Sequence, residues 1–500
     1  MTTNHTDVLI VGAGISGVSV AYHLQKDRPE KTYKILEKRK EMGGTWDLFR
    51  YPGIRSDSDM FTLGFRFKPW EASKAIADGP SILSYVNETA DEFGIRDHIL
   101  FERAVESLRW SSEDARWSVE VANEVTGEQE THTANMVAMC AGYYSYENPY
   151  TPEFEGIGDF EGEAFHAQLW PEDLDYTDKK VVVIGSGATA VTIVPEIAKK
   201  AKHVTMLQRS PTYMGSRPSE DVIANSFRAI LPKKFGYDLI RWRNILLQQL
   251  FFQMARKRPE KMKEELITRI REALPDGYEV ETHFTPSYNP WDQRLCLVPD
   301  DDMFNAISDG SASVVTDHIA RFDKTGIQLK SGERLDADIV VMATGLRLQM
   351  MGGADIVVDG EPITLADTYL YKGMMLSGVP NLSMTFGYTN ASWTLKADLT
   401  SEYFCRLIRH MDETGTDIAT PVLNETLEDR PFVDFSSGYV KRALPDLPKQ
   451  GSEKPWRLNQ NYTLDLMSLR FGKVDDGAMR FSKATKAEAA AAPELAQAAE

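Results

Sequence analysis

Residues 7–17 read DVLIVGAGISG, and this stretch decides the fold class. The apolar run at its start is typical of a buried parallel strand, and a helical stretch, Val18–Gln25, follows the glycines. In such a turn Gly12 permits the sharp bend, Gly14 lets backbone N–H groups approach a pyrophosphate, and Gly17 lets helix and strand pack closely. The pattern therefore predicts a dinucleotide-binding turn at the start of an α/β domain.

An acidic residue stands where this turn needs one. The strand-like run 33–36 ends at Glu37, twenty residues beyond Gly17, and its carboxylate is placed to accept hydrogen bonds from a ribose. A glycine motif alone would be weak evidence, because such motifs also occur without a nucleotide. Strand, helix and acid at these offsets together favour a nucleotide site over a purely structural turn.

A second turn of the same kind lies in residues 180–190, KVVVIGSGATA, where Ala190 takes the third small-residue place. The strand that follows, 204–207, leads into Arg209 and Ser210 instead of an acid. An acid there would repel a 2′-phosphate, whereas a guanidinium attracts one. The second site is therefore predicted to prefer NADP over NAD; the alternative is that Arg209 is an unrelated surface arginine.

Composition narrows the class of protein. The chain has 500 residues, which predicts two or three domains, and its formal net charge is −18. An acidic balance argues against nucleic acid and against an anionic membrane as partners. No apolar run is long enough for a transmembrane helix, and the early strand leaves no room for a signal peptide. Three widely spaced cysteines suit a reducing compartment, so a cytoplasmic location is expected.

The pattern along the chain predicts how the domains alternate. Between the two halves of a second nucleotide domain, apolar residues recur at helical spacing in 239–254 and 262–274, separated by Pro259. We expect this insertion to pack on the α/β core and wall a substrate pocket; a helix lying on a membrane surface is the alternative. The predicted division is a first dinucleotide-binding domain at 1–150 and 339–480, a second, NADP-binding domain at 151–215 and 286–338, a helical insertion at 216–285 and a disordered tail at 481–500.

Two further stretches carry more specific patterns. Residues 43–57, GGTWDLFRYPGIRSD, are rich in glycine, proline and aromatic residues, which favours an ordered loop with a binding role over an ordinary packed loop. Residues 160–171, FEGEAFHAQLWP, lie between the two nucleotide turns. By themselves they read as a linker with an aromatic residue near each end and a histidine between them.

Together these patterns resemble the type I Baeyer–Villiger monooxygenases, and long stretches are similar to the ethionamide-activating subgroup. The segment 160–171 matches that family's F-x-G-x-x-x-H-x-x-x-W-P fingerprint at Phe160, Gly162, His166 and Trp170. In the related N- or S-oxygenating flavin monooxygenases, tyrosine takes the place of the tryptophan in this pattern. Residues 43–57 match a second family pattern, G-G-x-W-x-x-x-x-Y-P-G-x-x-x-D, at every fixed position.

The resemblance implies specific roles. FAD would be held and lined by one set of residues and NADPH by another, with Arg294 as the catalytic arginine, Asp57 as its carboxylate partner, and no metal. The FAD set comprises Gly12, Gly14, Ser16, Gly17, Glu37, Thr45, Trp46, Asp47, Leu48 and Val105, and Arg55, Ser56 and Asp57 would lie where the flavin and nicotinamide meet. The NADPH set comprises Gly185, Ser186, Gly187, Ala188, Thr189, Ala190, Arg209 and Ser210. Family members commonly have lysine before the catalytic arginine; Gln293 stands here, which removes a charge that would bind the 2′-phosphate.

The implied activity consumes NADPH and O₂ and inserts one oxygen atom next to a ketone carbonyl, giving an ester or lactone. Small apolar ketones and sulfides are the expected substrates, with S-oxidation of thioethers or thioamides at the same site. Two alternatives stay open: an N- or S-oxygenating flavin monooxygenase, and a non-catalytic FAD/NADP-binding regulator. We expect His166 to position the segment between the domains instead of acting as a base.

Overall fold

The computed structural model describes residues 4–433 and 435–486. Within these residues, a nine-stranded sheet forms the first domain, in the order β18-β17-β4-β5-β6-β1-β2-β3, with β21 pairing on β6. Its parallel centre contains β1 (Asn4–Val11), β2 (Tyr33–Leu36), β3 (Ile99–Leu100), β6 (Gln129–Met139) and β21 (Leu382–Met384). Its other strands are β4 (Arg103–Ser111), β5 (Arg116–Asn123), β17 (Asp355–Val358) and β18 (Glu361–Pro362). The strand predicted at residues 7–11 therefore lies in the middle of this sheet.

Two helices close one face of the first sheet. α1 (Ile15–Asp27) follows the glycine turn and packs against the long helix α11 (Trp393–Thr414) from the far end of the chain. The contact is partly polar, because the Ser19 hydroxyl donates to Asp398 over 3.2 Å. α4 (Gly79–Glu92) packs beside α1. Residues almost 400 positions apart are thus needed to complete one nucleotide-binding domain.

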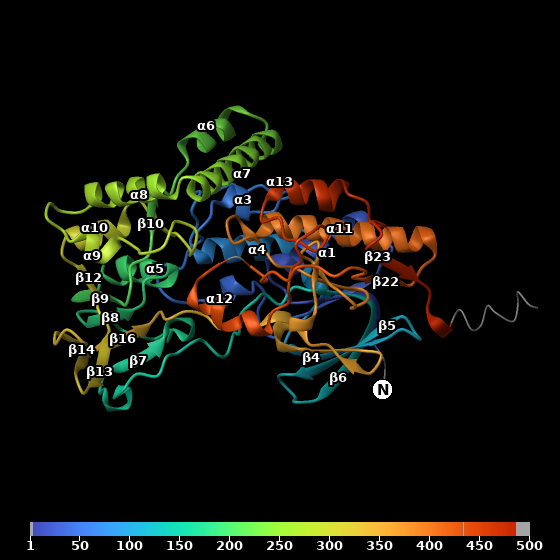
Figure 1. The fold of residues 1–500 in the computed structure, drawn as a ribbon, viewed down its shortest axis with the longest axis horizontal. Helices are drawn as coiled ribbons and strands as arrows, with labels where there is room; N and C mark the ends of the chain where they lie inside the picture. The colour runs from blue at the N-terminus through green and yellow to red at the C-terminus, as the bar shows by residue number, and fades with distance from the viewer. Residues whose placement is uncertain (1–3, 434, 487–500) are drawn as a thin grey trace, which may run out of the picture.

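The second sheet is parallel throughout, in the order β12-β9-β8-β16-β7. Its strands are β7 (Glu163–His166), β8 (Lys180–Ile184), β9 (His203–Gln208), β12 (Ala312–Thr316) and β16 (Ile339–Met342). α5 (Ala188–Ile197) follows the second glycine turn and packs against α10 (Asp302–Ser308). A small antiparallel sheet of β13 (Ile319–Asp323), β14 (Gly326–Leu329) and β15 (Arg334–Asp336) lies next to it in Figure 1.

The strand pairing corrects one sequence-based boundary. Residues 339–342, predicted to begin the second part of the first dinucleotide-binding domain, form β16 between β8 and β7 of the second sheet. The chain rejoins the first sheet only at β17. A continuous apolar strand looks the same in either sheet, so the sequence could not assign this strand to one of them. Near the C-terminus, β23 (Met479–Ser482) pairs with β22 (Ile418–Pro421), so the first two residues of the predicted disordered tail belong to a strand. Residues 487–500 of the predicted tail lie outside the described residues.

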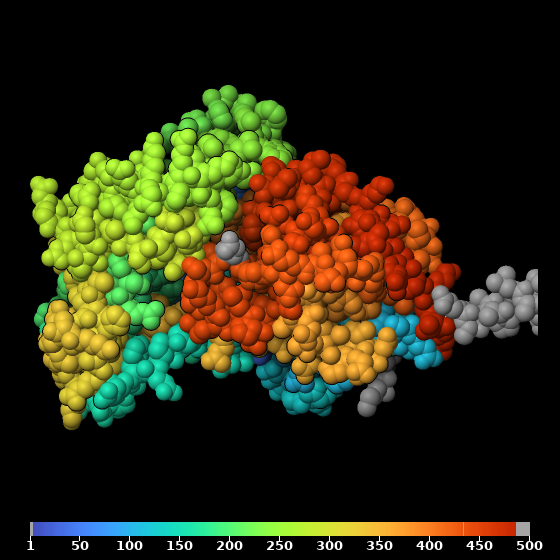
Figure 2. All heavy atoms as spheres, viewed as in Figure 1, coloured from blue at the N-terminus to red at the C-terminus, as the bar shows by residue number. Residues whose placement is uncertain are grey.

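The insertion is helical, as the sequence predicts. It contains α6 (Val222–Ile230), α7 (Lys233–Lys257), α8 (Pro259–Ala273) and α9 (Val280–Phe284), and Pro259 is the first residue of α8. α7 packs on α3 (Met60–Leu63) of the first domain, while α8 contacts α9 and α10 beside the second sheet. In Figure 1 α6, α7 and α8 lie along the upper edge of the molecule, from above the second sheet to the centre. Figure 2 shows its green residues meeting the orange and red C-terminal segment along a hollowed seam.

Two short regular elements lie outside the segments in which the sequence indicates helices or strands. Thr45–Leu48 forms the one-turn helix α2 inside the loop 43–57, and Cys296–Pro299 forms β11, which pairs in parallel with β10 (Met214–Arg217). Both elements are only four residues long, which is too short for hydrophobic periodicity to reveal. The pairing of β10 with β11 brings the two ends of the insertion together. It also fixes the position of Arg294, two residues before β11.

Candidate active site

The first glycine turn has the shape that a bound dinucleotide needs. Gly12 has φ +102°, and a Cβ added there would lie 2.5 Å from the carbonyl oxygen of Cys140. A Cβ on Gly17 would lie 2.0 Å from the oxygen of Gly12, so only glycine lets α1 approach the turn this closely. Gly14 has more space around it, because a Cβ added there would lie 3.6 Å from its nearest neighbour, the Cα of Gly44. The turn is therefore tight against the protein and open at the residue expected to meet the pyrophosphate.

Glu37 is fixed beside this turn. Its carboxylate accepts the backbone N–H of Ala13 over 2.7 Å and that of Arg39 over 3.0 Å. Burial raises the pKa of Glu37, although these two hydrogen bonds act against the shift. Each carboxylate oxygen keeps a further acceptor site, so the group can still receive a ribose hydroxyl. The first turn and its acid thus fit the adenosine half of FAD.

The second turn fits a second dinucleotide. Gly185 has φ +139°, and a Cβ there would lie 2.3 Å from the oxygen of Ala343. Gly187 caps α5, and a Cβ on it would meet nothing within 4 Å. The Ser186 hydroxyl donates to the carbonyl of Ser210 over 3.0 Å, which places the exposed Arg209 and Ser210 next to the turn. An exposed guanidinium beside an open helix N-terminus suits a phosphorylated ribose.

The loop 43–57 begins beside the first turn and contributes to the wall of the central cavity. Gly44 lies against Gly14, the Thr45 hydroxyl bonds to that of Tyr144, and Trp46 lines the central cavity. Asp47 is 3% exposed and pairs with Arg39 and Arg50, so its carboxylate holds the loop together. Asp47 and the buried Leu48 do not line the cavity, although the family resemblance places both next to the flavin.

A cavity of about 1030 Å³ lies between the two turns and beneath the insertion. Its wall brings together residues from segments far apart in the sequence, most of them apolar or aromatic. Of the predicted site residues, it includes Ser16, Thr45, Trp46, Arg55, Ser56, Asp57, Ala188, Thr189 and Arg294. Arg55 forms an ion pair with Asp302, and the Ser56 hydroxyl donates to the carbonyl of Ser58 over 2.7 Å.

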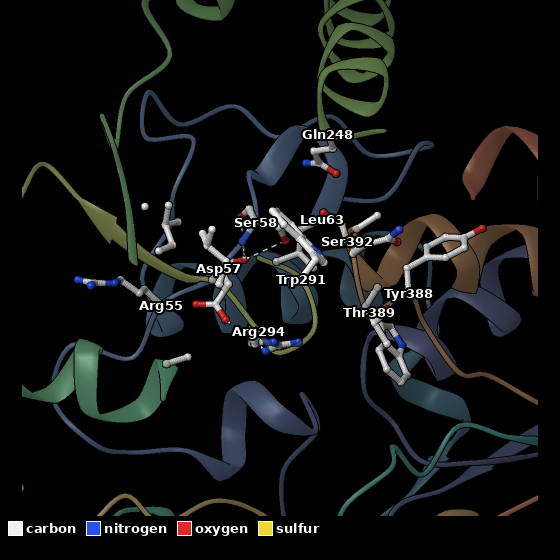
Figure 3. Close-up of a pocket in the computed structure, with 18 of the residues that line it drawn as sticks. Arg55, Asp57, Ser58, Leu63, Gln248, Trp291, Arg294, Tyr388, Thr389 and Ser392 are labelled. Atoms are coloured by element: carbon white, nitrogen blue, oxygen red, sulfur yellow. Dashed lines mark hydrogen bonds and ion pairs between the residues drawn. The ribbon is translucent and has the colours of Figure 1, made fainter. Parts of the chain in front are cut away.

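The predicted catalytic pair meets in this cavity. Arg294 Nη1 lies 3.3 Å from Asp57 Oδ2, and the side chains are 45% and 33% exposed to the open space. Figure 3 shows the pair close together, with the Trp291 indole above Arg294 and with Tyr388 and Thr389 across the space. Burial alone would lower the pKa of Arg294, but Tyr439 and Asp57 raise it above its ordinary value. The guanidinium therefore stays charged and has N–H groups left to donate into the cavity.

The fingerprint residues do not line the cavity and lie in or next to β7, at the edge of the second sheet. Gly162 passes so close to Asp338 that an added Cβ would lie 2.4 Å from its carbonyl oxygen, and the Trp170 ring meets Phe165 edge-on at 5.2 Å. Phe160 makes a similar edge contact with Phe322 at 6.1 Å.

Val105, which the family resemblance places near the adenine of FAD, is half-buried on β4 of the first sheet.

His166 has the environment of a structural residue. Its Nδ1 accepts the N–H of Gln168 over 3.1 Å, so Nε2 carries the proton and donates to the carbonyl of Gly345 over 3.2 Å. The side chain is buried, which lowers the pKa of His166 to about 4. The neutral imidazole, with a hydrogen bond at each ring nitrogen, therefore links the end of β7 to the loop after β16.

Several cavity residues carry no local sequence signal. Gln248 comes from α7, Ser392 and Trp393 come from the start of α11, and Tyr143 follows β6. The Trp393 indole donates to the Ser16 hydroxyl over 2.8 Å, which links the first turn to the C-terminal segment. None of these residues belongs to a motif, so only the folded chain reveals them. Among the described residues, no group of three or more His, Cys, Asp or Glu side chains could hold a metal ion.

Two dinucleotide folds face a shared cavity that contains a charged arginine, and this arrangement fits an enzyme that binds two dinucleotide cofactors. The family described as flavin-binding monooxygenase-like matches residues 74–375, and the NAD(P)-binding Rossmann-like domain matches residues 10–76. The chain belongs to the flavin-binding monooxygenase-like family.

Relatives and solved structures agree with this assignment. The chain is 54% identical over 483 residues to the FAD-containing monooxygenase EthA of Mycolicibacterium smegmatis, covering 96% of this chain and 98% of that one. It is 47% identical over 484 residues to the probable FAD-binding monooxygenase AlmA of Acinetobacter baylyi, covering 96% and 97%. A steroid monooxygenase bound to NADP has the same fold, with TM-score 0.75 and 22% identity over 96% of this chain and 100% of that one. An open cyclohexanone monooxygenase has TM-score 0.76 and 19% identity over the same shares.

Proposed function

We propose that this protein is a Baeyer–Villiger monooxygenase that converts small apolar ketones to esters or lactones and also oxidises sulfur in thioethers and thioamides. The observation that carries the proposal is the Arg294–Asp57 pair, 3.3 Å apart in an apolar cavity between two dinucleotide turns. The overall reaction turns ketone, O₂, NADPH and a proton into ester, NADP⁺ and water.

The cofactors are FAD and NADPH, and each of the two glycine turns binds one of them. The first turn, Glu37 and Thr45–Trp46 hold FAD, while the second turn with Arg209 and Ser210 holds NADPH. When bound, the reduced flavin supplies an activated form of O₂ to the cavity. We assign 1–150 and 343–480 to the FAD-binding domain, and 151–215 with 286–342 to the NADP-binding domain, with 160–171 as the connection between them.

Arg294 donates hydrogen bonds to oxygen atoms that gain negative charge as the ketone reacts. Donors fixed in advance at such a position stabilise the transition state without reorganising. Asp57 orients the guanidinium through one N–H and leaves the others for the substrate. The aromatic side chains of Trp291, Tyr388 and Trp393 keep water from the reacting groups, which strengthens each of these interactions.

The test is a panel of linear, cyclic and aryl ketones together with thioethers, incubated with the FAD-loaded enzyme, NADPH and ¹⁸O₂. We expect NADPH consumption to match ester or lactone formation for at least one ketone, with one ¹⁸O atom in the product. Hydrogen peroxide as the sole product for every compound would refute oxygenation. Sulfoxides without any ester would favour the S-oxygenating alternative, and no NADPH oxidation at all would favour the regulator.

A further inference from the structure

One side of α7 is apolar and open to solvent. Phe235, Leu239, Trp242, Leu246 and Leu250 recur every three or four residues and therefore share one helix face. Each is between 39% and 60% exposed. These five residues are called the α7 stripe below. In Figure 1 α7 lies near the upper edge of the molecule, next to α6.

The stripe is not an isolated feature. Ile230 at the end of α6 is 79% exposed, and Leu464 and Met467 are also exposed. The last two residues belong to the region of α13 (Tyr462–Asp465), whose Tyr462 ring meets the Trp242 ring at 5.8 Å. The apolar surface therefore extends over three helical segments. A contiguous patch of this kind marks an interaction site more often than an ordinary solvated surface.

The opposite side of α7 holds the helix in this orientation. Tyr237 and Ile240 are buried, and the Arg241 guanidinium donates to the carbonyls of Phe61 and Gly64 over 2.8 and 2.7 Å. Satisfied buried hydrogen bonds resist rotation of the helix. The stripe is thus presented outward by the fold and cannot turn into the core.

The charge around the stripe is opposite to that of the whole chain. Residues 222–273 contain 12 Lys and Arg against 5 Asp and Glu, a surplus of seven positive charges in a chain whose net charge is −18. Lys233 and Lys234 are exposed at the first turn of α7, and Lys257 and Arg258 are exposed at its end. The acidic total that argued against an anionic surface therefore conceals a basic region at the insertion.

The same helix also borders the cavity. Leu247, Phe251 and Met254 line the cavity from positions next to the stripe, and Arg258 and Lys261 line it beyond the end of α7. Apolar surface thus continues around the helix from solvent to the interior of the site. A substrate that dissolves in hydrocarbon would meet apolar side chains along this face of α7.

We propose that the insertion docks on an anionic lipid bilayer, with the α7 stripe in the interfacial layer and the basic ends of α7 against the headgroups. This is the arrangement of amphipathic helices that lie in the plane of a membrane. No helix among the described residues is long and apolar enough to span a bilayer, so the contact is peripheral. Uptake of apolar substrate from the bilayer rests on the proposed function; docking itself does not.

Vesicle flotation of the full-length, FAD-loaded protein tests the docking. The vesicles are pure phosphatidylcholine, or phosphatidylcholine with phosphatidylglycerol at about 7:3 so that they carry negative charge. We expect the protein to float with the anionic vesicles and to dissociate at 1 M salt, where the screening length is about 3 Å. Leu250→Glu should lower the partition coefficient about tenfold or more, because it removes an apolar side chain that the bilayer would bury and adds an acid.

Val125→Glu is the matched control, since Val125 is 65% exposed on a hairpin loop outside the insertion. It should float like the unaltered protein, and both variants should keep the rate with a short, water-soluble ketone. The proposal is wrong if the unaltered protein stays with neither vesicle, or if Leu250→Glu floats unchanged. It is also wrong if the unaltered protein is a dimer that Leu250→Glu makes monomeric without vesicle binding. Flotation without any ketone oxidation would retain docking and refute only the proposed function.

Discussion

Replacement of Arg294 provides the sharpest test of the assigned chemistry. The side chain is held by Asp57 at 3.3 Å and is 45% exposed to the cavity, so its removal leaves the core packing intact. Loss of one fixed donor to a developing oxyanion costs about 2.7–4 kcal/mol, which is roughly 10²–10³ in rate. We therefore expect Arg294→Ala to lower ester formation by that factor while FAD content and thermal unfolding stay unchanged.

Conservative variants should lose less ester-forming activity than Arg294→Ala. Arg294→Lys keeps the charge but cannot donate to Asp57 and to substrate with the same fixed geometry, so we expect a loss of about tenfold. Asp57→Asn keeps the shape and removes the carboxylate, and its loss should be of similar size. Arg321, exposed on β13, supplies the control: Arg321→Ala should have no effect.

The assay measures initial ester formation by gas chromatography alongside NADPH consumption and hydrogen peroxide release. In Arg294→Ala, NADPH oxidation should exceed ester formation, because activated oxygen that does not react with ketone is lost as peroxide. Ester formation within about threefold of the unaltered enzyme would contradict the role given to Arg294, since a missing oxyanion donor cannot have so small an effect.

Three further predictions follow from the turns and the domain connection. Arg209→Glu should raise KM for NADPH about tenfold or more and leave KM for NADH nearly unchanged, as measured by steady-state kinetics with both coenzymes, because it replaces attraction for the 2′-phosphate by repulsion. Gly17→Ala should lower Tm and FAD content, because its Cβ would lie 2.0 Å from Gly12 O, whereas Gly187→Ala, with open space around it, should keep Tm and weaken only NADPH binding. Because burial lowers the pKa of His166 to about 4, protonation favours the unfolded chain, so stability should be complete above about pH 6.5 and fall as pH drops toward 4; His166→Gln should flatten this dependence in thermal melts.

Local sequence determined a large part of this protein. The two glycine turns, Glu37 and the family patterns are short-range features whose geometry depends on residues close together in the chain, so they identify two dinucleotide folds without any tertiary information. The helical insertion follows from apolar periodicity over two long helices, and the packing of α7 and α8 agrees with it. The family patterns, through the resemblance that they carry, also predicted FAD as the partner of NADP.

Only the tertiary structure decided which residues share the cavity. Gln248 and Trp393 lie in helices and Ser392 precedes α11, and none of the three belongs to a sequence motif. The assignment of β16 to the second sheet also required its observed pairing. The outward orientation of the α7 stripe also depends on the buried Arg241 at its back. A turn is set by neighbours in the chain, whereas a cavity wall and an exposed face are set by how distant segments pack, and no single stretch of sequence encodes that packing.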